Sequence, residues 1–298
     1  MNCNSAEGDP PYKEYLSKMS AKIIDGKKIA DSIISGLKEK IKSMKQKPGI
    51  ALVLVGKNPA SEVYVNFKEK DSKEVGLHCE RYNLPEDTKE TDLLRLISEL
   101  NKKPAIHGIL VQLPLPKQID EHIVINSILP QKDVDGFSPL SLGNLATGEE
   151  TIVPATARAV VRLIESTGTK IEGKHAVILG RSNIVGKPSA LMLLEKNATV
   201  TICHSKTKNL AGHTKMADIL VAAIGKPRFV TGEMIKQGAV VIDVGINRTG
   251  SKLVGDVDFE TAKSVAGFIT PVPGGVGPMT RAMLTENTLK AMELQLKK

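Results

Sequence analysis

Short apolar runs alternate with amphipathic segments along most of this chain, and this alternation constrains its fold more than any other feature. The clearest run, residues 50–55, contains only Ile, Ala, Leu and Val, as expected for a strand that is covered on both faces. A helical pattern follows at residues 59–75, after Asn58 and Pro59, which are typical of a helix start. Because strands that alternate with helices form parallel sheets with right-handed crossovers, the sequence predicts an α/β fold.

The same two patterns recur in order along the chain. Apolar runs typical of strands occur at residues 23–24, 77–82, 106–111, 175–179, 198–203, 219–223 and 239–244. Helices are expected near residues 29–44, 87–100, 121–128, 156–167 and 187–195, and from about residue 280 to the end. Segment 137–153 is rich in Gly, Ser and Thr and is the expected hinge between two domains, while segment 271–278 has too much Pro and Gly for a helix.

The composition is that of an ordinary globular enzyme, with 41% hydrophobic and 25% charged residues among 298. The net charge of +8 would suit nucleic acid, but the lysines are dispersed and only 3% of the residues are aromatic, so a polyanionic small molecule is the better partner. The three cysteines lie far apart and the histidines form no metal-binding pattern, so neither a disulfide framework nor a metal site is expected. No apolar run has the length of a membrane span and the N-terminus lacks an apolar signal core, so we expect a cytosolic protein.

Residues 175–188 are the stretch around which the second half of the chain is organised. An apolar strand is followed by a turn at Gly180 and by a helical pattern that begins near Gly186. The unpaired N–H groups at a helix start suit a phosphate, and glycine lets a ligand approach the backbone. Because the spacing differs from GxGxxG, a purely structural turn is the alternative interpretation.

The next expected strand, residues 198–203, favours NADP as the cofactor. In NAD-binding folds an Asp or Glu usually ends this strand and holds the ribose 2′-OH. Here segment 204–207 supplies hydroxyl groups and a lysine but no acid. Ser205, together with Arg181 at the preceding turn, would suit an adenosine 2′-phosphate, and an ordinary polar loop is the alternative.

Ser61, Tyr64 and Lys68 share one stripe of the expected helix at residues 59–75, because they are spaced by three and four positions. An aromatic ring and a lysine one turn apart, shortly after the end of a strand, can provide a stacking surface and a proton-transfer group. A free lysine has a pKa of about 10.4, so base catalysis near neutrality requires burial or neighbours that lower it. A solvated lysine on a helix surface is the alternative.

Further candidate binding groups lie in loops. Gln112 follows an apolar strand and could hydrogen-bond a lysine or a substrate, or be an ordinary loop residue. Asp133 and Asp135 could act as an acid–base pair, but we favour one of them as a ligand for the amino group and ring N–H of a pterin or guanidinium-like ring. A turn stabilised by Asp before Gly136 is the alternative. The loop 274–277 would let a flat ligand approach the backbone, or simply cross between domains.

Taken together, five segments resemble the bifunctional methylenetetrahydrofolate dehydrogenase/cyclohydrolase family, the FolD type, over about residues 20–296. They are YVNFK at 64–68, GILVQLPLP at 108–116, KDVDG at 132–136, GRSNIVGKP at 180–188 and PGGVGPMT at 273–280. Five such motifs in this order are much more specific than any one of them.

The resemblance implies two α/β domains and a particular division of the chain. Residues 21–154 plus 281–298 would form a parallel-sheet folate/catalytic domain, and residues 155–280 a Rossmann-like NADP-binding domain. The C-terminal helix would pack back on the first domain, and residues 1–20 would be an N-terminal extension. The resemblance also implies a homodimer, and the composition already argues against nucleic acid or a membrane as partner.

The resemblance further implies that NADP⁺ takes a hydride from 5,10-methylenetetrahydrofolate and that water then opens the methenyl cation to 10-formyltetrahydrofolate in the same cleft. Lys68 would transfer the proton of the hydrolytic step and Gln112 would orient it, while Tyr64 would stack on the folate and Asp135 would bind the pterin. The implied substrate-binding residues are Ser61, Tyr64, Gln112, Asp135, Pro273, Gly274 and Gly275. The implied cofactor-binding residues are Gly180, Arg181, Ser182, Ser205 and Ile246.

One segment departs from the family pattern, and two other functions fit part of the sequence. Pro154-Ala155-Thr156-Ala157 stands where the family usually has Pro-Cys-Thr-Pro, which bears on the geometry of the hinge. A shikimate-dehydrogenase-like enzyme would explain the second half of the chain but neither segment 133–136 nor segment 273–280. A non-catalytic NADP-binding sensor would not need Lys68.

Overall fold

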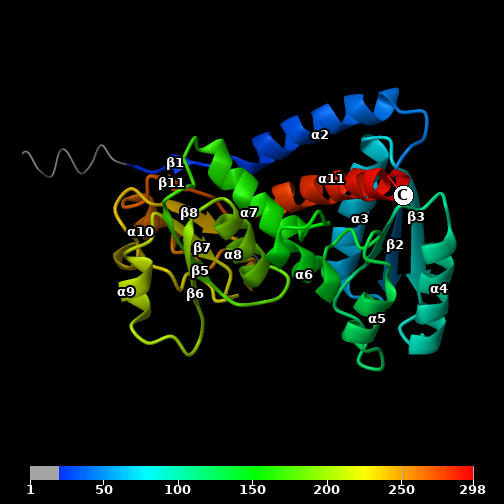
Figure 1. Ribbon diagram of the computed structural model, residues 1–298. Coiled ribbons are helices and arrows are strands. Elements are labelled where there is room, and N and C mark those ends of the chain that lie inside the picture. Colours follow the sequence, from blue (N-terminus) through cyan, green and yellow to red (C-terminus); the bar gives the residue numbers. More distant parts are fainter. Residues whose placement is uncertain (1–19, 251, 298) are drawn as a thin grey trace, which may run out of the picture.

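The computed structural model describes residues 20–250 and 252–297, so residues 1–19 of the expected extension lie outside the described residues. Two parallel sheets form the centres of two α/β units, and long helices run between the units along the top of the view in Figure 1. The α/β fold with two parallel-sheet units, which the alternation of strands and helices predicts, is confirmed.

The larger sheet has six parallel strands and forms the second unit. Its order is β1 (Lys22–Ile23), β11 (Phe268–Ile269), β8 (Val240–Asp243), β7 (Ile219–Ala222), β5 (His175–Leu179) and β6 (Thr199–Cys203). The helical elements around it are α7 (Ala155–Ser166), α8 (Gly186–Glu195), α9 (Leu210–Thr214), η1 (Gly232–Met234) and α10 (Phe259–Lys263). Successive residues of β5 face opposite sides of the sheet. Ile178 packs in the cluster that contains residues of α7 and α8, whereas Val177 packs in the cluster that contains residues of η1 and α10.

The smaller sheet has three parallel strands in the order β3 (His78–Leu84), β2 (Gly49–Val55) and β4 (Gly108–Val111). Every residue of β2 is buried, because the strand lies between two layers of helices. Leu52 packs in the cluster that includes α3 (Pro59–Glu74), whereas Val53 packs in the cluster of α4 (Glu90–Lys102) and α5 (Glu121–Ser127). The prediction of a strand covered on both faces is confirmed.

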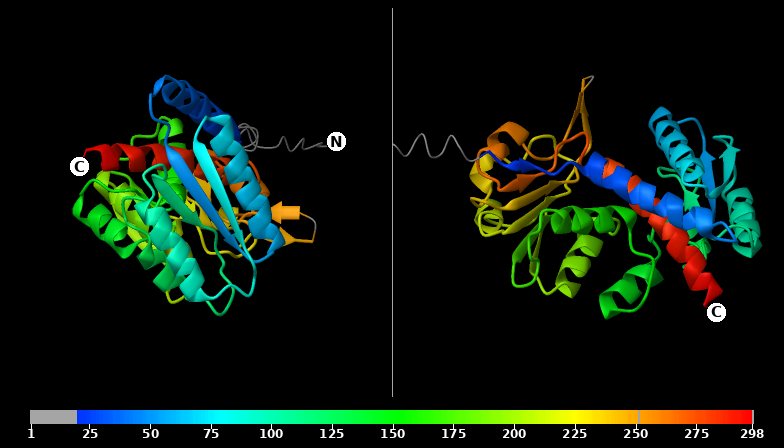
Figure 2. Two further views of the ribbon diagram at one scale, coloured as in Figure 1. Left: turned by 90° about the vertical axis from the view of Figure 1, so that its right-hand side faces the viewer. Right: turned by 90° about the horizontal axis from the view of Figure 1, so that it is seen from above.

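Helices α2 (Gly26–Ser43) and α11 (Val276–Leu296) run from one unit to the other, as the view from above in Figure 2 shows. Helix α11 packs on α7, on α2 and on the smaller sheet. Its Asn287 Nδ2 donates to the carbonyl oxygens of Val134 and Val153, both at 2.9 Å. The predicted return of the C-terminal helix to the first unit is confirmed.

Strand β1 lies in the larger sheet, although the helix that follows it packs along the first unit. Lys22 pairs with Phe268 and Ile23 with Ile269, in parallel. The expected first domain, residues 21–154 plus 281–298, therefore begins with residues whose hydrogen bonds belong to the second sheet. The division of the chain into domains otherwise stays a prediction.

The segment expected to be a hinge, residues 137–153, contains helix α6 (Pro139–Thr147). Ser138 Oγ caps it by accepting a hydrogen bond from Ser141 N at 3.1 Å, and Gly148 ends it with φ of 76°. A Ser-Pro start and a Gly end are ordinary helix signals, but this helix was not predicted because composition was given more weight than capping. The role of the segment as a hinge stays a prediction.

Two other helix starts differ from the prediction. Helix α4 begins at Glu90 rather than at residue 87, because Thr88 N donates to the Pro85 carbonyl in a turn. Helix α11 begins at Val276, inside the segment predicted to be a loop. Pro278 fits there because the first N–H groups of a helix have no partner within it. A short hairpin of β9 (Asn247–Thr249) and β10 (Lys252–Val254) was not predicted.

Candidate active site

Helix α3 begins just after the carboxyl end of β2 and carries two of the predicted site residues, Tyr64 and Lys68. Asn58 caps its first turn, because its Oδ1 accepts hydrogen bonds from Ala60 N at 3.0 Å and Ser61 N at 3.1 Å. The cap fixes where the helix begins, and the helical period then places Tyr64 and Lys68 one turn apart on the same side.

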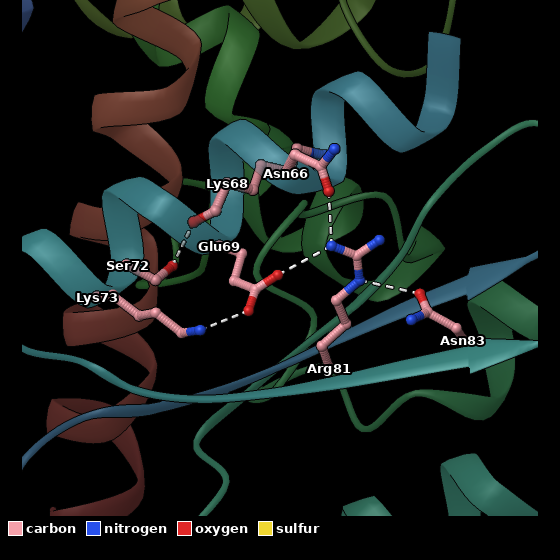
Figure 3. A network of polar contacts seen from close by, with 7 residues as sticks. All are labelled: Asn66, Lys68, Glu69, Ser72, Lys73, Arg81 and Asn83. Atoms are coloured by element: carbon pink, nitrogen blue, oxygen red, sulfur yellow. Dashed lines mark hydrogen bonds and ion pairs between the residues drawn. The ribbon is translucent and has the colours of Figure 1, made fainter. Parts of the chain in front are cut away.

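The outer face of α3 is tied to strand β3 by the polar network in Figure 3. Arg81 Nη1 donates to Asn66 Oδ1 at 2.6 Å and pairs with Glu69 Oε2 at 2.9 Å. Lys73 Nζ pairs with the other oxygen of Glu69 at 2.6 Å. Isolated surface ion pairs stabilise little, but several that share one carboxylate restrict the rotation of the helix. The network therefore helps to keep Lys68 directed away from β3.

Lys68 and Gln112 form the central contact of the site. Lys68 Nζ donates to Gln112 Oε1 at 3.0 Å. Gln112 follows β4, and its backbone N–H donates to the Val53 carbonyl at 2.8 Å. Its Nε2 donates to the Leu113 carbonyl at 2.6 Å, which turns Oε1 toward the lysine. The predicted contact between Gln112 and a lysine is thus present, over 44 residues of sequence.

Burial and one acid set the charge state of Lys68. Burial lowers the pKa of Lys68 from 10.5, and the negative charge of Asp135 partly opposes this. Burial likewise raises the pKa of Asp135, and the positive charge of Lys68 partly opposes that shift. Each charge therefore favours the charged form of the other, but burial has the larger effect on both. Lys68 releases its proton more readily than an exposed lysine.

The two acids of segment 133–136 have different surroundings. Asp133 is 2% exposed, and its carboxylate accepts hydrogen bonds from Gly136 N at 3.0 Å and Ser138 N at 2.7 Å. Burial, with the charge of Asp135, raises the pKa of Asp133 to about 7 against these hydrogen bonds. Asp135 lies beside Lys68 and lines the same cavity. Asp133 therefore holds the turn that presents Asp135.

A cavity of about 420 Å³, here called the inner cavity, brings the predicted catalytic residues together. Its polar lining includes Tyr64, Lys68, Gln112, Asp135, Thr156, Thr280 and Arg281. Ile184, Val185 and Ile246 of the second unit complete its wall. The inner cavity thus lies where the two units meet.

A second cavity of about 320 Å³, here called the outer cavity, continues from the inner one. The two share Tyr64 and Ile246, and the outer cavity is also lined by the predicted substrate-binding residues Pro273, Gly274 and Gly275. Ser61 is 4% exposed and lines neither cavity. Ser61 is therefore the one predicted substrate-binding residue that the structure does not bring to this surface.

A third cavity of about 310 Å³, here called the sheet-edge cavity, lies at the carboxyl ends of β5, β6 and β7. Gly180, Arg181, Ser182 and Ser205 all line it, whereas Ile246 does not. A Cβ at Gly180 would lie 2.2 Å from the Ala223 carbonyl oxygen, so only glycine permits this turn. The glycine turn, the exposed Arg181 and the hydroxyl-bearing loop fit a dinucleotide with an additional phosphate.

Ser182 has a structural contact as well as a place in the sheet-edge cavity. Its Oγ accepts from Val185 N at 3.2 Å and from Gly186 N at 3.3 Å. These N–H groups at the start of α8 are thus partly satisfied by the protein, which weakens the expectation that the helix start alone holds a phosphate.

Arg281 lines both the inner and the outer cavity and was missed in the sequence. Its guanidinium carbon lies 4.8 Å from the centroid of the Phe67 ring, and its Nε lies 3.0 Å from Asp71 Oδ2. Because the start of α11 was placed too late, the shared face of Gly277 and Arg281, spaced by four positions, was not recognised.

Family models match both units of the chain. Residues 24–135 match the catalytic domain of tetrahydrofolate dehydrogenase/cyclohydrolase, and residues 154–296 match the NAD(P)-binding domain of the same enzymes. The chain belongs to the tetrahydrofolate dehydrogenase/cyclohydrolase family. The resemblance stated from the five motifs is therefore confirmed, and so is the expectation of a nicotinamide-dinucleotide enzyme.

Individual members of the family are similar over almost their whole length. The bifunctional protein FolD of Moorella thermoacetica is 57% identical over 277 residues, which cover 92% of this chain and 99% of the relative. The crystal structure of the FolD enzyme of Campylobacter jejuni has a TM-score of 0.90 at 46% identity, covering 93% of this chain and 100% of that one. The Trypanosoma brucei enzyme, solved with an NADP cofactor and an inhibitor, has a TM-score of 0.88 at 39% identity, covering 94% and 99%.

Membership in the tetrahydrofolate dehydrogenase/cyclohydrolase family decides between the functions that fit the sequence. It confirms the predicted enzyme class and leaves the shikimate-dehydrogenase-like and sensor alternatives without support. Among the described residues, no group of three or more His, Cys, Asp or Glu side chains is placed to hold a metal ion. No helix in residues 20–250 or 252–297 is long and apolar enough to span a membrane.

Proposed function

We propose that this chain oxidises 5,10-methylenetetrahydrofolate with NADP⁺ and hydrolyses the resulting 5,10-methenyltetrahydrofolate to 10-formyltetrahydrofolate in a single cleft. The observation that carries the proposal is the lining of the inner cavity, where the Lys68–Gln112 pair faces Ile246 of the second unit. A folate carbon between these walls would be within reach of both a proton-transfer group and a cofactor on the larger sheet. NADP⁺, when bound, supplies the acceptor for the hydride.

Tyr64 and Asp135 would orient the folate. Tyr64 lines both the inner and the outer cavity, so its ring can stack on the part of the folate that passes between them. The carboxylate of Asp135 can accept hydrogen bonds from the amino group and ring N–H of the pterin. The Pro273–Gly275 backbone would then shape the outer cavity for the rest of the molecule.

Lys68 would transfer the proton in the hydrolytic step. The methenyl intermediate is a cation, so a protonated lysine beside it would repel it, whereas a neutral amine can accept a proton from the attacking water. Burial lowers the pKa of Lys68 in the direction that this role requires. Gln112 would hold Nζ in place through its Oε1 while water adds to the carbon.

The preference for NADP over NAD would come from the sheet-edge cavity. Strand β6 ends at Cys203 and is followed by His204 and Ser205, with no acid to hold a ribose 2′-OH and repel a phosphate. Arg181 lines the same cavity and can donate to a 2′-phosphate.

On the family resemblance we also propose that the enzyme is a homodimer, and on its dispersed lysines and the lack of a long apolar run that it binds neither nucleic acid nor a membrane. Light scattering of the purified protein coupled to size-exclusion chromatography tests the dimer. A mass of one chain, 32.1 kDa, would contradict it.

The experiment for the proposed function follows NADPH and the methenyl species together, at two wavelengths, with 5,10-methylenetetrahydrofolate and NADP⁺. We expect NADPH to rise without an equal rise of the methenyl species, and 10-formyltetrahydrofolate to be recovered. Equal accumulation of the methenyl species would mean that the hydrolytic step is absent. No NADPH would overturn the oxidative half of the proposal.

A further inference from the structure

Two buried carboxylates meet at the carboxyl ends of β7 and β8, and the reaction described above uses neither. Asp256 is completely buried and Asp243 is 3% exposed. They are connected because Asp256 N donates to Asp243 Oδ1 at 2.9 Å. Asp256 lines none of the inner, outer and sheet-edge cavities, so any effect it has must pass through its neighbours.

Four N–H groups converge on the Asp256 carboxylate. Its Oδ2 accepts from Ile224 N at 2.7 Å and from Gly225 N at 2.9 Å. Its Oδ1 accepts from Lys226 N at 2.9 Å and from Asn247 Nδ2 at 2.8 Å. A carboxylate that accepts this many hydrogen bonds in a buried place fixes all the segments that donate them, because any donor that left would lose its partner.

Two of these donors line one cavity, and a third is next in sequence to a residue that lines two others. Ile224 and Lys226 line the sheet-edge cavity. Asn247 follows Ile246, which lines the inner and outer cavities. Asp243 adds to these hydrogen bonds, because its Oδ1 also accepts from Gly245 N at 2.9 Å. Asp243 and Asp256, with the N–H groups that donate to them, are here called the carboxylate frame. The two carboxylates thus connect the loop after β7 with the loop after β8.

Two glycines permit the carboxylates to come this close to the backbone. A Cβ at Gly245 would lie 2.3 Å from the Asp256 carboxyl group, and a Cβ at Gly255 would lie 1.8 Å from Asp243 Oδ2. Neither position could carry a side chain without moving a buried carboxylate and the loops bound to it. The arrangement therefore needs both the acids and the glycines.

We propose that Asp256 is a positioning residue for the oxidative step, an inference that rests on the proposed function. It holds the 224–226 loop and the start of the β9–β10 hairpin so that the cofactor on the sheet-edge cavity and the folate beside Ile246 meet at a fixed distance. Hydride transfer depends steeply on that distance. The hydrolytic step uses Lys68, Gln112 and Asp135, and none of the hydrogen bonds of these residues goes to Asp256 or to the groups that Asp256 binds, so this step should depend on Asp256 much less.

The variant Asp256→Asn tests the inference with little change in shape. An amide has one acceptor oxygen where the carboxylate has two, and each oxygen accepts from two donors, so two of the four donors lose their partner. We expect dehydrogenase kcat/KM for NADP⁺ to fall about tenfold or more, while hydrolysis of preformed methenyltetrahydrofolate without NADP⁺ stays within about twofold. Equal losses in both reactions, or no loss in either, would overturn the proposal.

Asp218→Asn is the matched control. Asp218 also accepts a backbone hydrogen bond in the larger sheet, from His175 N at 2.9 Å, but at the opposite edge, where β5 begins. We expect this variant to lower thermal stability without changing the ratio of the two activities. A shift of that ratio as large as the one in Asp256→Asn would show that any weakening of the sheet has the same effect, and would overturn the proposal.

Asn247→Ala keeps the test possible if Asp256→Asn does not fold, since it removes one donor and leaves the carboxylate. A rise in the Kd of NADP⁺ in Asn247→Ala, with unchanged hydrolysis, supports the proposal, and an unchanged Kd overturns it. The Kd is measured calorimetrically without folate. A wild-type enzyme that binds NADP⁺ but forms no NADPH would refute the proposed function, whereas the effect of the variants on Kd would still test Asp256.

Discussion

The inner cavity and the sheet-edge cavity use different parts of the chain for the two reactions that we propose. In the inner cavity polar side chains face the space, and Lys68, Gln112 and Asp135 supply the groups. The sheet-edge cavity is shaped by backbone, at Gly180 and at the loop that Asp256 holds, and the side chains of Arg181 and Ser205 complete it. The difference shows that transferring a proton needs one particular group with a shifted pKa, whereas holding a dinucleotide needs a backbone of fixed shape.

Lys68→Met should have the largest effect and tests the first half of the comparison. We expect hydrolysis to fall at least about 100-fold, because a positioned acid–base group contributes that much or more, while part of the dehydrogenase activity survives. Lys70→Met, an exposed lysine on the same helix, is the control and should leave both steps unchanged. Equal and modest losses in both steps would count against the assigned role.

Arg181→Ala combined with Ser205→Ala tests the second half. If these residues bind the 2′-phosphate, the ratio of KM for NADP⁺ to KM for NAD⁺ should rise about 10- to 100-fold, as expected for lost hydrogen bonds to a charged group. Lys215→Ala removes an exposed positive charge from the same unit and serves as the control. An unchanged ratio in the double variant would refute the 2′-phosphate assignment.

Asp135→Asn should shift the pH dependence of hydrolysis and so sharpen the electrostatic part of the comparison. The charge of Asp135 raises the Lys68 pKa, and burial lowers it. Without that charge the Lys68 pKa falls further, so the neutral amine forms at lower pH and kcat for hydrolysis should rise at a lower pH than in the wild type. Asp92→Asn changes an exposed acid and is the control, which should leave this pH dependence unchanged. A shift to higher pH in Asp135→Asn would contradict the assignment.

Ser61→Ala should have the smallest effect. Ser61 shares the α3 stripe with Tyr64 and Lys68, but it is buried and lines neither the inner nor the outer cavity. We expect KM for the folate to change by no more than about twofold. A rise of about tenfold or more, measured beside Tyr64→Ala, would show that the hydroxyl reaches the bound folate after all and would restore the role implied by the resemblance.

The residues of the inner cavity were easier to predict than those of the carboxylate frame around Asp256. Lys68 and Tyr64 lie on a helix whose cap and period are visible in the sequence. Gln112 follows strand β4, and Asp135 belongs to a short acidic turn before a glycine. Arg281 was missed because the start of α11 was placed four residues too late, at residue 280 rather than at Val276.

Asp256 gave no comparable signal. It lies in a segment where no element was expected, and its donors come from residues 30 to 32 positions earlier and from Asn247. Acids beside glycine are common in turns, so the local pattern does not distinguish a buried frame from an ordinary loop.

By itself, the sequence determined the α/β class, the buried strand β2, the helix that carries Lys68 and the family. These features depend on the periodicity and capping of short segments, which backbone geometry imposes within a few residues. The tertiary structure decided that Lys68 meets Gln112, that β1 joins the larger sheet and that Asp256 accepts hydrogen bonds from the loop beside the sheet-edge cavity. Such contacts join segments far apart in the chain, and only the packing and register of the whole fold determine which side chains meet.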